Sequence, residues 1–69
     1  MRYEIVEVST VAGLTRSVIV DRGGDEFTSF PAVVGNPNYD SFLESQGLTD
    51  AEVQAMEPDV WHDMAASAI

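Results

Sequence analysis

A helix start at Asn36 divides the chain into a β-rich first half and a helical second half. Asn36 is a favourable helix N-cap, and Pro37 follows at the first helical position, where its missing N–H costs nothing. Tyr39, Phe42 and Leu43 stand at i, i+3 and i+4, so they share one face of the helix. We expect this helix to act as a lid that closes a small sheet.

Two capped helices are expected in the second half of the chain. The first covers residues 37–46 and stops at Gly47, because glycine readily adopts the left-handed conformation that ends helices. The second begins after Thr49, where Thr49 and Glu52 have the spacing of a capping box. It is expected to run from Asp50 to about residue 56.

Three strands are expected before the first helix, over residues 2–9, 14–21 and 26–30. Turn-forming residues fill the two short connections at 10–13 and 22–25, so neighbouring strands should pair antiparallel. The sequence therefore predicts an α+β fold, a three-stranded antiparallel β-meander followed by two short capped helices.

Three local features refine this prediction. The apolar alternation changes face between Ile5 and Val6, which suits either a strand with both faces partly covered or a strand with a β-bulge there. Residues 32–35 are apolar and could add a short fourth strand. Phe27 and Phe30 should point to opposite faces of the sheet, because side chains alternate along a strand.

The chain is expected to form a single small domain over residues 1–69. The β-meander would occupy residues 1–34, the helices residues 36–57, and a C-terminal docking segment residues 58–69. A chain of 69 residues without cysteine cannot be stabilised by disulfides, so self-association or docking onto a larger partner is the expected support.

The charge distribution restricts the class of partner. Twelve carboxylates face three arginines and no lysine, for a net charge of -9, and residues 23–69 contain no basic side chain except the neutral histidine. Such a chain should repel nucleic acid and anionic membranes, and no apolar run approaches the roughly 20 residues of a membrane span. It would attract a basic protein surface, although acidity can also serve solubility alone.

Sequence motifs for catalysis or metal binding are weak. Oxygen-bearing side chains after Asn36 have the first spacings of a calcium loop, but Ser41 and Gly47 stand where that loop needs glycine and glutamate. A second acidic cluster surrounds His62, which we expect beside carboxylates at the surface; its members are Glu57, Asp59, His62 and Asp63. We therefore expect no catalytic residue, no metal site and no cofactor.

Large side chains in the second half are the candidates for partner binding. They are Tyr39, Phe42, Trp61 and Met64. Aromatic residues and methionine are enriched in the centres of protein interfaces. The alternative is that these side chains form the core. The first strand could also extend the sheet of a partner by edge pairing.

Part of the chain, residues 26–61, resembles short proteins of tailed bacteriophages, especially cyanophage-like ones. The motif consists of Phe30-Pro31, Asn36-Pro37-Asn38-Tyr39 and Phe42-Leu43. In those proteins a β-hairpin and a proline precede an Asn-Pro/Arg-x-Tyr helix start. The resemblance implies a phage-encoded protein associated with the virion, and it implies no catalytic residues.

The expected function is a non-enzymatic virion structural or accessory protein. It would bind a larger viral capsid, neck or tail protein, and self-association into a homo-oligomer is a further expectation. Its location would be the virion, or the host cytoplasm before assembly. The one-sided acidity leaves open an acidic inhibitor of a host nuclease or other nucleic-acid enzyme. A host regulator or toxin-system partner is a third reading.

Overall fold

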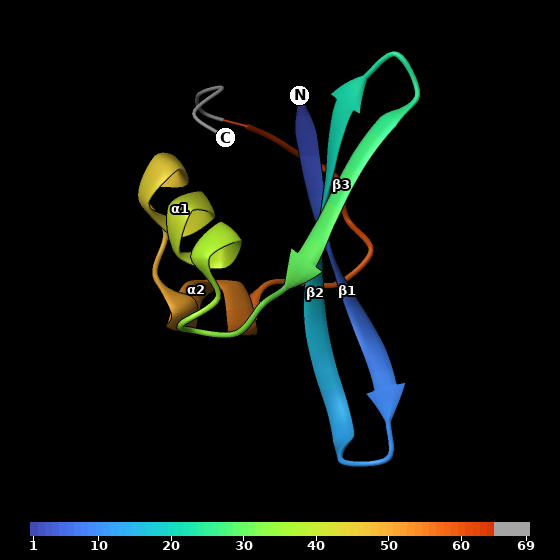
Figure 1. Ribbon diagram of the computed structural model, residues 1–69, viewed down its shortest axis with the longest axis vertical. Coiled ribbons are helices and arrows are strands. Elements are labelled where there is room, and N and C mark those ends of the chain that lie inside the picture. Colours follow the sequence, from blue (N-terminus) through green and yellow to red (C-terminus); the bar gives the residue numbers. More distant parts are fainter. Residues whose placement is uncertain (65–69) are drawn as a thin grey trace.

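Two helices pack against one face of an antiparallel sheet (Figure 1). The computed structural model describes residues 1–64. The strands lie in the order β3-β2-β1-β4, with β1 at Arg2–Thr10, β2 at Gly13–Gly23, β3 at Glu26–Pro31 and β4 at His62–Asp63. The predicted α+β fold, a meander followed by two short helices, is confirmed. The two-residue β4 was not predicted.

Helix α1 spans Pro37–Gln46 and has the predicted caps at both ends. The side-chain oxygen of Asn36 accepts hydrogen bonds from the backbone N–H groups of Asn38 and Tyr39, at 3.1 and 3.2 Å. At the other end Gly47 has a φ of 64°, and the N–H of Leu48 donates to the carbonyl of Leu43 at 3.0 Å. These bonds satisfy backbone groups that a helix end leaves unpaired.

Helix α2 spans Asp50–Ala55 and begins with the predicted capping box. The hydroxyl oxygen of Thr49 accepts from the N–H of Glu52 at 3.2 Å, and the Glu52 carboxylate accepts from the N–H of Thr49 at 3.1 Å. A six-residue helix is too short to be stable alone, so α2 also depends on tertiary contacts.

Two of the alternatives left open for the strands are wrong, namely the β-bulge near Ile5 and Val6 and the fourth strand over residues 32–35. The β1–β2 register runs without interruption through Ile5 and Val6, and the irregularity lies between Asp21 and Gly23 of the β2–β3 pair. There the Asp21 carboxylate accepts from the N–H of Gly23 at 2.8 Å, a local bond that competes with the ladder. Residues 32–35 form no strand; Val34 and Gly35 form a turn, which the N–H of Asn36 closes by donating to the carbonyl of Val33 at 3.1 Å.

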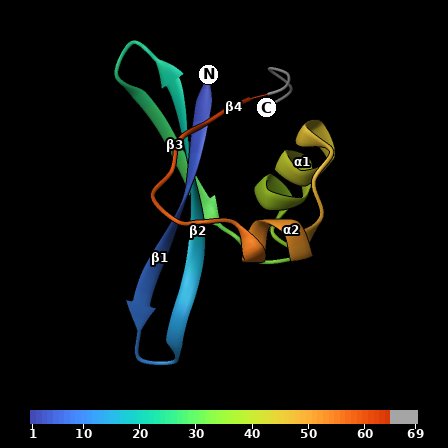
Figure 2. The same cartoon turned by 180° about the vertical axis from the view of Figure 1, so that it is seen from behind.

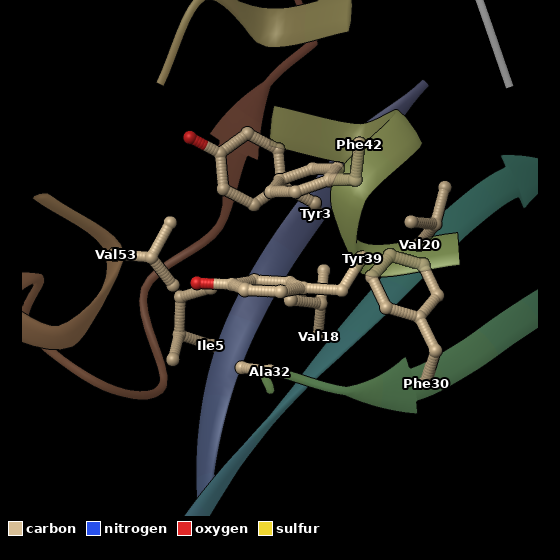
Figure 3. Close-up of a cluster of buried hydrophobic side chains, with 9 residues drawn as sticks. All are labelled: Tyr3, Ile5, Val18, Val20, Phe30, Ala32, Tyr39, Phe42 and Val53. Atoms are coloured by element: carbon tan, nitrogen blue, oxygen red, sulfur yellow. The ribbon is translucent and has the colours of Figure 1, made fainter. Parts of the chain in front are cut away.

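The core lies between the sheet and the two helices (Figure 3). Phe42 of α1 contacts aromatic rings from two strands, with centroids 5.0 Å from Tyr3 and 5.8 Å from Phe30. Phe27 is exposed while Phe30 is buried, as the alternation predicted. The buried cluster comprises Tyr3, Ile5, Val18, Val20, Phe30, Ala32, Tyr39, Phe42 and Val53.

The chain after α2 returns to the sheet and runs along the outer edge of β1 (Figure 2). The N–H of Asp59 donates to the carbonyl of Ile5 at 2.8 Å, and the N–H of Met64 donates to the carbonyl of Met1 at 3.0 Å. Residues 65–69 of the expected docking segment lie outside the described residues.

Candidate interaction surface

Two of the four candidate partner contacts belong to the core. Tyr39 and Phe42 have no exposed surface, so no partner can reach either side chain while the fold is closed. Met64 is partly buried against the same cluster. Their burial therefore supports the core alternative for Tyr39 and Phe42, and the expectation that these two residues bind a partner is wrong. Their i, i+3 spacing directs both rings onto the sheet, which is the lid function expected of α1.

The Tyr39 hydroxyl reaches through the core to the start of the second helix. It donates to the Asp50 carboxylate at 2.6 Å, and Asp50 also accepts from the Gln54 side chain at 3.3 Å. Burial, and then the hydrogen bond to Asp50, raise the pKa of Tyr39 to about 12. The hydroxyl stays protonated near neutral pH and joins α1 to α2.

Arg16 is a structural residue that sequence reasoning did not identify. Its guanidinium donates to the carbonyls of Val53 and Met56, at 3.2 and 2.7 Å, and lies 3.5 Å from the Glu7 carboxylate. The two carbonyls lie at the C-terminal end of α2, where a helix favours positive charge. Arg16 therefore fastens α2 to the sheet. The sequence places Arg16 on the same strand face as Val18, and a charged side chain on an apolar face usually has a partner, so this structural role could have been predicted.

The acidic cluster around His62 does not assemble. The His62 ring stacks on Tyr3 with centroids 5.1 Å apart, and its Nε2 atom is buried without a hydrogen-bond partner among residues 1–64. The expectation of a surface histidine beside carboxylates is therefore wrong. Pairing of Tyr3 with His62 and of Arg2 with Asp63 puts neighbouring side chains of β4 on opposite faces. Within residues 1–64 no group of three or more His, Asp or Glu is placed to hold a metal ion.

Trp61 lies at the surface, unlike the other three candidates. Its side chain is 37% exposed, and the Arg2 guanidinium carbon is 5.2 Å from the centre of the indole ring. Arg2 also lies 3.5 Å from the Asp21 carboxylate. Strand alternation places Arg2 and Asp21 on the sheet face opposite the buried Tyr3 and Val20.

This second face, which we call the uncovered face, carries a mixed apolar and polar surface. None of the described helices packs against it. Phe27 is 61% exposed there, and Val8 is also exposed. Side chains two residues apart on a strand share a face, so Val6, next to Val8 on this face, and Ile19, next to Asp21, contribute half-buried side chains. The uncovered face thus offers large apolar side chains that the core does not use.

The edges of the sheet differ in their availability. Residues 2 and 3 of β1 already pair with β4 and Ile5 accepts a bond from Asp59, so this part of the first strand is not available for the edge pairing with a partner that we expected. Beyond Ile5 the edge of β1 has no paired strand among the described residues. The hydrophobic alternation of the sequence predicted correctly which side chains lie on each face of the sheet. It could not predict which edge of the sheet the C-terminal segment covers.

No helix within residues 1–64 is both long and apolar enough to cross a bilayer. Comparison of the chain with protein-family models, with curated proteins and with solved structures found no match.

Proposed function

We propose that this protein is a non-enzymatic accessory protein that docks onto a larger protein. The observation that supports this proposal most directly is the sheet with helices on one face only. Phe27 and Trp61 remain exposed on or beside the other face, although the core has its own complement of aromatic rings. Aromatic side chains that the fold itself does not bury are the usual anchors of protein interfaces.

The proposed partner class is a capsid, neck or tail protein of a tailed bacteriophage. The resemblance of the Asn36 helix start to small phage proteins favours this class. The residues that carry the resemblance have structural roles in this fold, since Asn36 caps α1 while Tyr39 and Phe42 fill the core. Self-association would have to overcome the repulsion between chains of net charge -9, so docking onto the larger protein is the contact that we propose.

Quantitative mass spectrometry of purified particles tests the virion role. Particles of a phage that encodes the chain should contain it at a fixed copy number after removal of loosely bound protein in high salt. Copies of six, twelve or a few would indicate the neck or baseplate, and hundreds would indicate the shell or tube. Absence of the protein from intact particles would contradict the virion role.

An acidic inhibitor of a nucleic-acid enzyme is the second candidate, and the placement of charge favours it. All three arginines lie on strands β1 and β2, whereas the helices and the following loop carry only acidic charges. Exposed carboxylates on this helical side are Asp40, Glu44, Glu52, Glu57 and Asp59. Inhibition of a nuclease that weakens steeply between low and high salt would support this candidate. No inhibition at low salt across a panel of host nucleases would contradict it.

A further inference from the structure

The β1–β2 hairpin extends beyond the rest of the molecule (Figure 1). Pairing of β2 with β3 ends at Ser17 and Pro31, followed by one bond from the N–H of Ala32 to the carbonyl of Arg16. Beyond this point the register contains only pairs between β1 and β2, from Glu7–Arg16 to Thr10–Gly13. We call residues 7–16 the arm.

The outer part of the arm carries no charge. Residues 8–15 contain no acidic or basic side chain, in a chain of which 22% is charged and whose net charge is -9. Glu7 and Arg16 form an ion pair at the base of the arm, at 3.5 Å. The arm therefore holds an uncharged surface away from the carboxylates of the body.

Apolar side chains on the arm are exposed to an unusual degree. Val11 at the tip is fully exposed, and Leu14 is 72% exposed although its neighbours along the same face, Arg16 and Val18, pack into the body. Val8 is exposed on the opposite face. None of these three side chains belongs to the core, so stability of the fold does not account for them.

The turn at the tip is fixed by its own hydrogen bonds. The Thr10 hydroxyl donates to the carbonyl of Gly13 at 2.8 Å and accepts from the N–H of Ala12 at 3.2 Å. Gly13 has a φ of 114°, a conformation that side-chain-bearing residues rarely adopt. A tip held in this way loses little conformational freedom on binding, which favours affinity.

We propose that the arm inserts into an uncharged apolar groove of the larger partner protein. This inference rests on the proposed docking function and deepens it by naming the contact. Charge matching favours such a groove, because burying the outer part of the arm, residues 8–15, desolvates no ionised group, whereas docking through the helical side would desolvate several carboxylates. A second copy is a poorer occupant, since two chains of net charge -9 repel each other.

A protein groove also suits the arm better than a lipid bilayer does. The carbonyl of Ile5 faces the outer edge of β1, where it accepts from Asp59. Backbone groups alternate in direction along a strand, so those of Glu7 and Ser9 face the same edge. These groups have no paired strand there among the described residues. Protein or water can satisfy them, but the hydrocarbon core of a membrane cannot.

Site-specific photo-crosslinking in the full-length chain tests this proposal. A benzophenone amino acid would replace Val11 in one variant and Glu44, an exposed residue of α1, in the control. Both proteins would be irradiated in cells that naturally make the chain, and the crosslinked peptides would be identified by mass spectrometry. The proposal predicts a crosslink from position 11 to apolar residues of one larger protein, and none to it from position 44.

Affinity for that purified partner gives the second readout. The double variant Val11→Ser, Leu14→Ser should bind at least about tenfold more weakly, because even one buried aliphatic side chain corresponds to such a change. Its melting temperature should equal that of the unmodified chain, because neither side chain packs in the core. Unchanged affinity would overturn the proposal.

The crosslinks separate failure of the arm from failure of the proposed function. Crosslinks to a larger protein from position 44 alone would leave docking intact and overturn the arm. Crosslinks from position 11 only to a second copy, or only to lipid, would also overturn it. If neither position crosslinks to a protein and the chain co-purifies with none, the docking function itself fails.

Discussion

Replacement of Arg16 by methionine should destabilise the fold far more than the same replacement of Arg2. Both arginines lie 3.5 Å from a carboxylate, Glu7 for Arg16 and Asp21 for Arg2, so a count of ion pairs treats them alike. Their surroundings differ, because the Arg16 side chain is only 16% exposed and the Arg2 side chain is 53% exposed. Methionine keeps much of the apolar stem in each case.

The magnitude follows from the groups that lose a partner. Arg16 donates to the carbonyls of Val53 and Met56, and hydrogen bonds to charged groups contribute about 1.5–3 kcal/mol. Loss of positive charge at the end of α2 adds about 0.5 kcal/mol. One guanidinium nitrogen makes both bonds, so we count them as a single interaction and expect Arg16→Met to lower the free energy of unfolding by about 2–4 kcal/mol. In a chain of this size that corresponds to a fall in melting temperature of roughly 10–30 °C.

Urea and thermal unfolding at neutral pH, followed by circular dichroism, measure the difference. Arg2→Met should cost no more than about 1 kcal/mol, since an exposed ion pair and one contact with Trp61 are lost. The loss of unfolding free energy for Arg16→Lys should lie between the losses for these two variants, because an ammonium group keeps the positive charge but lacks the planar set of donors of a guanidinium group. Equal losses for Arg16→Met and Arg2→Met would refute the conclusion that Arg16 fastens α2 to the sheet.

Substitutions at three further positions test the core and the caps. The pKa of Tyr39 rises to about 12 on folding, so the folded state holds its proton where the unfolded state does not, and stability should fall as pH rises from about 10 to about 12. Tyr39→Phe should reduce this fall and cost about 1–2 kcal/mol at neutral pH; an unchanged alkaline slope in urea unfolding would contradict it. His62→Phe keeps the ring stacked on Tyr3 and removes Nε2, which has no partner among the described residues, so the melting temperature should stay level or rise by a few degrees. A large drop would show that Nε2 has a partner. Gly47→Ala should lower the free energy of unfolding by about 1 kcal/mol from backbone strain alone, because the φ of Gly47 is 64° and a Cβ there meets no atom within 4 Å. Gly47→Asn should lower it less. Equal stability of both variants and the unmodified chain would contradict the strain.

Local chemistry made the helices predictable. Asn36, Gly47 and the capping box at Thr49 each act through neighbouring residues, so the helix bounds could be predicted closely from the sequence. The alternation of Phe27 and Phe30 was equally local. Contacts between distant segments were not available in this way, which is why the pairing of His62 with Tyr3 was missed.

The candidate surface was harder to predict because aromatic content does not distinguish a core from an interface. Tyr39 and Phe42 are of residue types that are enriched at interfaces, but their helical spacing places both side chains on the side of α1 that packs against the sheet. Trp61 directly precedes β4, and because neighbouring side chains alternate it faces away from the side on which His62 lies. A two-residue strand has no recognisable sequence pattern of its own, so this placement could not be predicted. The arm could be recognised only from the point at which β3 stops pairing, which is a property of the sheet.

Hydroxyl-radical footprinting of the free and partner-bound chain tests the central claim most directly. We expect binding to protect Phe27, Trp61 and the Val11 tip from oxidation, because docking covers the uncovered face and the arm. Side chains on the helical side, such as Glu44 and Gln54, should react at the same rate in both states. Protection confined to the helical side, with Phe27, Trp61 and Val11 unchanged, would contradict the account and favour recognition through the carboxylates.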